Sequence, residues 1–244
     1  MGSFKLRLVI WFMLLALFPL LAATWAFSEV AVRGETGTAD ARLSTAIRVA
    51  QADYREQVED AGERATSLAR ATQVQRALAA SDRSALVRTS REVEDVAFYS
   101  RAGERIAGEA PGPYDARREA DVVSVEGGRR LGRVVAHVPF DQELLTALET
   151  KSALDEGDRF ALVVDGRVIA PASLMSEAEV PHERPRYVDV GGGAYRAVAT
   201  DLLAGEDARG RPPVTLVGLT PRADIDAAAG DLRERFLLFS IVAL

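Results

Sequence analysis

The sequence predicts an α+β fold in which a long N-terminal helix precedes two small lobes built on antiparallel sheets. Apolar or small residues recur every three or four positions from Leu43 to Thr72, which is the spacing of one continuous helix face. After Arg91 the period changes to two, and the alternating runs form two groups separated by a helical pattern at 140–154. Alternation of this kind is typical of half-buried strands. Because 244 residues suffice for two small domains, each group is interpreted as one lobe.

Both ends of the chain are apolar. Residues 8–27 carry no charge, and about 20 apolar residues suffice to cross a bilayer. Lys5 and Arg7 precede this run, which places the N-terminus in the cytoplasm by the positive-inside rule. A cleaved signal peptide is the alternative, but Thr24-Trp25-Ala26 fits a cleavage site poorly. We therefore expect a membrane helix at 8–27 that contacts the lipid bilayer.

Residues 236–244 are also uncharged, and they are about half as long as a membrane span. We expect them to begin a second transmembrane helix; the alternative is a short apolar tail docked on the domain. On the first interpretation the protein lies in the cytoplasmic (inner) membrane, and residues 28–235 form an extracytoplasmic loop between the two spans.

Charge and composition exclude several classes of function. The chain has 30 Lys and Arg against 36 Asp and Glu, a formal net charge of −6. Nucleic acid is therefore not an expected partner, because phosphate binding needs a basic face. The absence of Cys excludes disulfides and thiol chemistry, and two His make a histidine-built metal site unlikely to form. Abundant Ala, with Arg strongly preferred over Lys, is typical of a GC-rich bacterial genome.

The order of elements completes the predicted domain plan. Short helices are expected within 71–91, and Thr220-Pro221 opens a last helix because Pro suits the first helical position. The expected strands are 93–100, 104–108, 121–125 and 131–138 in the first sheet, and 159–164, 167–170, 186–190, 195–200 and 214–219 in the second. The predicted domains are 1–7 (cytoplasmic N-terminus), 8–27 (first transmembrane helix), 28–91 (long and short helices), 92–155 (membrane-distal lobe), 156–221 (membrane-proximal lobe), 222–235 (exit helix) and 236–244 (start of the second transmembrane helix).

Four segments of the loop carry a family resemblance. They are Leu68-Ala-Arg-Ala-Thr-Gln-Val-Gln-Arg-Ala-Leu78, Val96-Ala-Phe-Tyr-Ser-Arg-Ala-Gly-Glu-Arg-Ile-Ala107, Leu131-Gly-Arg-Val-Val-Ala-His-Val-Pro139 and Phe160-Ala-Leu-Val-Val-Asp-Gly-Arg-Val-Ile-Ala170. In these phrases and in the order of its elements, the chain resembles the double-lobed extracytoplasmic Cache sensor domains of bacterial receptors, whose lobes are PAS-like.

The resemblance implies an input domain of a histidine kinase, a diguanylate cyclase or a chemoreceptor. It also implies a small-molecule ligand and a homodimer, for which the long helix is the expected contact. Family members that bind amino acids carry an Arg followed closely by Trp-Tyr, whereas the corresponding region here is Tyr114-Asp-Ala-Arg-Arg-Glu-Ala-Asp121. Recognition of amino acids is therefore not carried over to this chain.

No catalytic motif is present, so we expect no enzyme activity within these residues, no cofactor and no metal site. Gly191, Gly192 and Gly193 fit a hairpin turn better than a phosphate cradle, since no Lys, Ser or Thr follows them. The candidate ligand-binding residues are polar or aromatic side chains at strand ends and in the loop that follows the first hairpin, namely Tyr99, Arg101, Tyr114, Arg117, Arg118 and His137.

Two arguments support these candidates. Arg117 and Arg118 could present a fork to a carboxylate or phosphate, although a solvated loop is the favoured interpretation. His137 has two interpretations. It could contact a ligand or act as a pH switch, or it could be a residue of an apolar strand whose hydrogen bonds are made within the protein.

The expected mechanism is mechanical. The last strand leads directly into the last helix, so a ligand that favours one shape of the lobe would displace that helix by an ångström or two. Two alternatives stay open. An anchored binding protein would need residues 236–244 buried on the domain, and a stalk would need the face between Leu43 and Thr72 to be its main interface.

Overall fold

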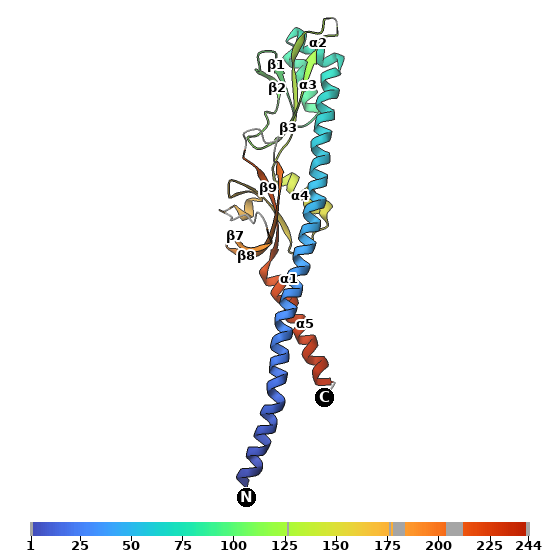
Figure 1. Ribbon diagram of the computed structural model, residues 1–244. Helices are drawn as coiled ribbons and strands as arrows, with labels where there is room; N and C mark the ends of the chain where they lie inside the picture. The colour runs from blue at the N-terminus through green and yellow to red at the C-terminus, as the bar shows by residue number, and fades with distance from the viewer. Residues whose placement is uncertain (1, 126, 176, 178–183, 204–211, 243–244) are drawn as a thin grey trace.

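The structure is a computed structural model that describes residues 2–125, 127–175, 177, 184–203 and 212–242. Within these, the side chains of residues 2–10, 12, 14, 16–17, 19–21, 23–24, 203 and 236–242 are not described. The molecule is elongated: helix α1 (Gly2–Arg70) runs along its whole length, two antiparallel sheets lie beside the C-terminal half of α1, and both chain ends lie at the same end of the molecule (Figure 1). The prediction of an α+β fold with a long helix and two antiparallel sheets is confirmed.

Helix α1 forms the common wall of both sheets through one face of small and apolar residues. That face consists of Ala39, Leu43, Ala46, Ile47, Ala50, Tyr54, Val58, Ala61, Ala65 and Ala69, all buried. It follows the predicted stripe except at its end, where Ala69 is buried, Leu68 is half-buried and Thr72 is exposed because the helix ends at Arg70. The face is covered by the chain's own sheets. It is therefore not free to be the main interface with another chain, as the stalk alternative requires.

The first sheet follows two short helices, α2 (Thr72–Ala80) and α3 (Arg83–Glu92). Asp82 caps α3 by accepting a hydrogen bond from the Ala85 N–H at 3.1 Å, which is a usual role for Asp at this position. The strands are β1 (Val96–Ser100), β2 (Arg105–Gly108), β3 (Ala116–Val123) and β4 (Arg130–Val138), in the spatial order β2-β1-β4-β3.

Strand β3 begins five residues before the predicted start at residue 121. Its first half, Ala116-Arg-Arg-Glu-Ala120, is too polar to predict as a strand, but β4 pairs with it along its whole length and places Ala116 opposite Val138. The interpretation of Arg117 and Arg118 as loop residues is therefore wrong: both lie in β3, paired with His137 and Ala136.

Helix α4 (Gln142–Ser152) connects the two sheets. Asp141 caps it by accepting hydrogen bonds from the N–H groups of Glu143 and Leu144, both at 2.9 Å. The second sheet contains β5 (Arg159–Val164), β6 (Arg167–Ala170), β7 (Arg186–Val190), β8 (Gly193–Leu203) and β9 (Val214–Pro221), in the order β6-β5-β9-β8-β7, with a 3-10 turn η1 (Ala172–Leu174) after β6. Gly191 and Gly192 form the β7–β8 hairpin turn with positive φ angles of 57° and 80°, as predicted.

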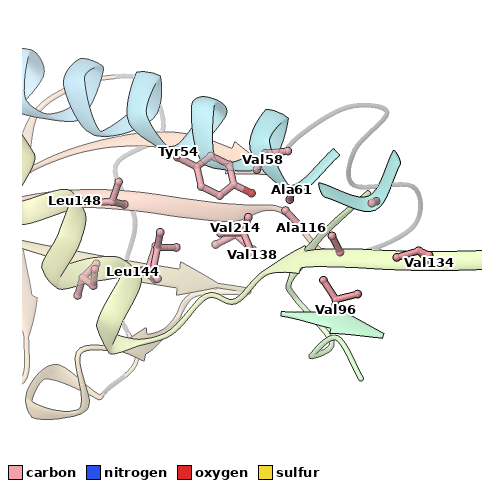
Figure 2. Packing of buried hydrophobic residues seen from close by; sticks show 14 of the residues in the cluster. Tyr54, Val58, Ala61, Val96, Ala116, Val134, Val138, Leu144, Leu148 and Val214 are labelled. Carbon is pink, nitrogen blue, oxygen red and sulfur yellow. The ribbon is translucent and has the colours of Figure 1, made fainter. Parts of the chain in front are cut away.

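The two lobes share one hydrophobic core. In Figure 2, Tyr54, Val58 and Ala61 of α1 lie near Leu144 and Leu148 of α4, together with valines of both sheets. A second, smaller cluster covers the other face of the second sheet. Helix α1 packs tightly on β9 at Gly218, where a Cβ atom would lie 3.2 Å from side-chain atoms of Leu43 and Ile47. The sheets are therefore attached to one helix and coupled through α4.

The chain leaves the second sheet through helix α5 (Arg222–Val242), which follows β9 without a loop and lies beside α1 (Figure 1). Pro221 does not open this helix as predicted: it is the last residue of β9 and pairs with Tyr195. Ile225 and Ala229 are buried on the α5 face. Within the described residues, no helix offers a stretch long and apolar enough to cross a membrane.

Candidate ligand cleft

An open cleft of about 1040 Å³ lies beside the end of the first sheet, between α1 and α4. Its walls come from α1, from the α3–β1 connection, from the end of β4 and from the start of α4. This volume is at the upper end of the range for small-molecule sites, roughly 300–1,000 Å³. Because the start of α4 contributes to its rim, a ligand here would contact the helix that connects the two sheets.

The cleft is strongly acidic. Its lining side chains include seven carboxylates and two guanidinium groups, so its formal charge is 2 − 7 = −5 with His137 neutral. The carboxylates come from separate elements, namely α1 (Asp60, Glu63), the α3–β1 connection (Glu94, Asp95), the end of the first hairpin (Glu109) and the start of α4 (Asp141, Glu143). Asp141 is engaged as the cap of α4, whereas no described residue forms a salt bridge with Glu63, Glu94 or Glu109. The electrostatic field in the cleft therefore favours a cation.

His137 lies in the wall of this cleft and is only 2% exposed. Its Nδ1 atom is 3.1 Å from Oδ2 of Asp115, which is also buried. The angle of this contact is poorer than that of an ordinary hydrogen bond. Asp115 also accepts the N–H of Gly112 at 2.6 Å, so the loop before β3 is held against the histidine.

The pKa of the Asp115 carboxyl is set by two opposing effects. Burial favours the neutral acid, but the contact with His137 and the backbone N–H groups of Gly112 and Phe140 stabilise the carboxylate more, so the pKa is lowered. Asp115 therefore stays ionised at neutral pH and orients the imidazole ring.

Asp95 sits at the start of β1 in a left-handed conformation with φ of 57°. Its backbone carbonyl accepts the His137 N–H at 2.9 Å. Burial raises the pKa of the Asp95 carboxyl, while His137 and Arg64 act in the opposite direction. The groups that act on Asp95 all line the same cleft, which shows that the cleft residues are electrostatically coupled.

Of the six residues predicted as ligand-binding, only His137 lines this cleft. Arg117 is its neighbour in the sheet, but its guanidinium group donates to the Gly112 carbonyl at 2.7 Å and so holds the same loop. The side chain of Arg118 lies on the opposite face, where its stem is near Gly62 of α1. Tyr114 is half-buried against the main core.

Tyr99 and Arg101 lie at the other end of β1, away from the cleft. Arg133 lies over the Tyr99 ring at 5.0 Å from its centroid and forms a salt bridge with Glu119 at 3.0 Å. Arg101 is exposed in the hairpin turn. The structure therefore does not join this pair to the other candidates.

Sequence reasoning missed Asp115, Asp95 and the carboxylates of α1. Asp60 and Glu63 are three residues apart and share a helix face, but this spacing also describes an ordinary solvated face. Only the packing of α4 and β4 beside α1 shows that these side chains border a cleft.

Two polar links tie α1 to the exit of the second sheet. Arg42 of α1 donates to Asp158 from Nε at 2.9 Å and from Nη2 at 3.2 Å. Asp158 is buried and also accepts the hydroxyl of Thr220 in β9 at 2.7 Å. This link joins α1 to Thr220, which is separated from the first residue of α5 by Pro221 alone.

The second link passes through Arg196 of β8. It donates two 2.8 Å hydrogen bonds to Asp40 of α1, and this pairing raises the pKa of its guanidinium group. Arg196 and Arg222, the first residue of α5, both lie over the Tyr187 ring, at 5.2 and 5.4 Å from its centroid. The Tyr187 ring thus contacts both an arginine that is paired with α1 and the first residue of α5.

Comparison with known proteins gives structural neighbours only. No protein-family model matches the chain, and no curated protein matches it in sequence. The chain is similar to the periplasmic domain of Vibrio cholerae LuxQ, with 9% identity, a TM-score of 0.43, and 78% of this chain and 99% of that one covered.

Two further neighbours are sensor proteins by name. A domain of a sensory box/GGDEF family protein from Vibrio parahaemolyticus has 11% identity and a TM-score of 0.48, with 80% and 99% of the two chains covered. The ligand-binding domain of the Pseudomonas aeruginosa amino-acid chemoreceptor PctC, in complex with GABA, has 14% identity and a TM-score of 0.29, with 56% and 60% covered. By their names, all three neighbours are domains of sensor or receptor proteins. The proposal below rests on the geometry of this chain.

Proposed function

We propose that this chain is the extracytoplasmic input region of a bacterial membrane receptor of the histidine kinase, diguanylate cyclase or chemoreceptor type. The observation that carries the proposal is the path of the chain: α1 and α5 leave the sheets side by side toward the same end, and β9 enters α5 without a loop (Figure 1). In this arrangement a small ligand bound at the sheets changes the position of α5 relative to α1.

The physical basis of transmission is that the second sheet is attached to both helices. The Arg42–Asp158–Thr220 link fixes β9 to α1 just before α5 begins. A ligand shifts the equilibrium between two lobe shapes by its difference in affinity for them. A helix displacement of about 1–2 Å is a sufficient output.

The membrane arrangement belongs to the same proposal. Residues 8–27 anchor the chain in the inner membrane with the N-terminus in the cytoplasm, and residues 28–235 lie outside; this follows from the uncharged run and the preceding Lys5 and Arg7. Because the chain has no Cys, single substitutions test it without background. A membrane-impermeant maleimide should label Val125→Cys in intact spheroplasts and leave Ser3→Cys unlabelled. Labelling of Ser3→Cys alone would reverse the orientation.

A homodimer through α1 is also proposed, with a specific limit on where it forms. The face from Ala39 to Ala69 is occupied by the chain's own sheets, so the contact uses the N-terminal part of α1, where Val30 and Val32 are exposed. Val30→Glu combined with Val32→Glu should convert the dimer to a monomer in sedimentation experiments. A dimer that survives this change would place the contact elsewhere.

Helical phase provides the test of signalling. A kinase reporter is fused after Leu244, and one to four alanines are inserted at Ala228 in α5. Each insertion rotates the downstream helix by about 100°, so the output should change with one or two insertions and return near its starting value with four. The same insertions at Ala102, in the exposed β1–β2 turn, are the control and should leave the output unchanged. A flat response at Ala228 would refute the proposal.

A further inference from the structure

We infer that the cleft beside α1 and α4 binds a small organic ligand with at least two ammonium groups, held by the cleft carboxylates and by the Nε2 atom of His137. The inference deepens the proposed sensory function, on which it rests, by assigning the site and the chemical class of the ligand.

The first observation is the charge of the cleft. Its formal charge is −5, and Glu63, Glu94 and Glu109 have no salt-bridge partner among the described residues. Carboxylates accept hydrogen bonds from ammonium groups, and such charge-assisted bonds are roughly twice as strong as neutral ones. Many solvated protein surfaces are acidic without binding a ligand, but this cleft has a second feature.

That feature is His137, which is 98% buried, yet neither of its ring nitrogens has a hydrogen bond of ordinary geometry among the described residues. Buried polar atoms of native proteins are nearly always paired. Asp115 lies 3.1 Å from the other ring nitrogen. An ionised carboxylate only accepts, so Asp115 favours a proton on Nδ1. The other ring nitrogen, Nε2, is therefore the atom of His137 that is available to a ligand in this acidic cleft.

The chemistry of the lining separates an organic cation from a metal ion. The described residues contain no cluster of three or more carboxylate, thiol or imidazole groups close enough to hold a metal. The carboxylates are instead distributed over four elements around about 1040 Å³. Distributed acceptors in a volume of this size fit a ligand whose positive charges are separated by a short carbon chain.

Binding to the full-length chain in nonionic detergent micelles tests the inference. Isothermal titration with 1,4-diaminobutane and spermidine should show saturable binding, whereas butylamine should bind at least tenfold more weakly and succinate should not bind. Glu63→Gln combined with Glu94→Gln should weaken diamine binding at least tenfold, because two charge-assisted contacts are lost. Glu56→Gln combined with Glu59→Gln, on the exposed side of α1 and with the same change in net charge, is the matched control and should change the Kd less than twofold.

A spectroscopic measurement tests the role of His137 without altering it. In a ¹⁵N-labelled His182→Gln chain, the remaining imidazole belongs to His137, and its Nε2 resonance should move on addition of 1,4-diaminobutane and remain still with succinate. An unmoved resonance, or equal loss of affinity in both double variants, would overturn the inference. Binding of Mg²⁺ that depends on Glu63 and Glu94, with no binding of either polyamine, would also overturn it.

The two proposals fail separately. Phase-dependent signalling without polyamine binding would refute this ligand assignment and leave the sensory function intact. Polyamine binding with a flat response to insertions at Ala228 would refute the sensory function and leave the site intact.

Discussion

The link between Arg42, Asp158 and Thr220 predicts how much each of three substitutions lowers the free energy of unfolding, and in which order. The Asp158 side chain is 1% exposed, while that of Arg42 is 36% exposed. Removing Arg42 leaves a buried carboxylate with only the Thr220 hydroxyl, and we expect Arg42→Ala to cost about 3–5 kcal/mol, the usual range for a broken buried pair.

Replacing Asp158 should lower the free energy of unfolding less than replacing Arg42 does. Arg42 keeps its 2.6 Å contact with Asp155 and its access to water, so the cost comes mainly from the buried Thr220 hydroxyl and from lost charge-assisted hydrogen bonds. We expect about 2–3 kcal/mol for Asp158→Ala. For Thr220→Val we expect about 1 kcal/mol, since one hydrogen bond is lost and a methyl group fills the space.

Urea unfolding followed by circular dichroism gives these free energies, with a constant m-value as evidence that only stability has changed. The control is Arg33→Ala, which breaks an exposed pair with Glu29 and should cost less than about 0.5 kcal/mol. The double variant of Asp158 and Thr220 should cost less than the sum of the two single changes, because both remove the same contact. A value for Asp158→Ala within about 0.5 kcal/mol of the control would refute this account of how β9 is attached to α1.

Four other substitutions should have distinct results. The lowered pKa of Asp115 means that its stabilising contribution is present above the unfolded-state pKa, near 4, and is lost as pH falls through the lower folded-state value; Asp115→Asn should therefore flatten the acid limb of urea midpoints measured from pH 5 to pH 2. Gly108→Ala should unfold the first sheet in amide-exchange measurements, because φ is +83° and the new Cβ would lie 2.0 Å from a β1 carbonyl oxygen, whereas Gly230→Ala in α5 meets no atom within 4 Å and should raise stability by up to about 1 kcal/mol. Tyr187→Leu, which removes the ring beneath Arg222, should reduce the ligand-dependent output of the reporter fusion while ligand affinity changes less than twofold.

The elements that were predicted well are those fixed by local chemistry. Asp165-Gly166 specifies a tight turn, and the strands on either side have the predicted bounds, β5 (Arg159–Val164) and β6 (Arg167–Ala170). The bounds of β7 (Arg186–Val190), next to the Gly turn, were also predicted. By contrast, the first half of β3 and the strand position of Pro221 depend on pairing with distant strands, which no local pattern encodes.

In the candidate site, too, some residues could be predicted from local sequence and others depend on tertiary packing. His137 could be found because an ionisable ring in an apolar strand stands out in the sequence. Arg117 and Arg118 also stand out, but the strand pairing turns them to opposite faces of the sheet. The cleft carboxylates come from segments that are distant in sequence, and only tertiary packing brings them to one place.

Two of the glycines of α1, Gly34 and Gly37, lie just before Asp40 and Arg42, where the second sheet is fixed to the helix. Nothing lies within 4 Å of where their side chains would be. Apart from proline, glycine is the residue that stabilises a helix least, so a helix can bend at a glycine at low cost. The section of α1 between the apolar run and the sheets is therefore one at which the helix can bend at low cost. A bend at this section would change the direction of the N-terminal part of α1 and leave the contacts of Asp40 and Arg42 with the second sheet in place.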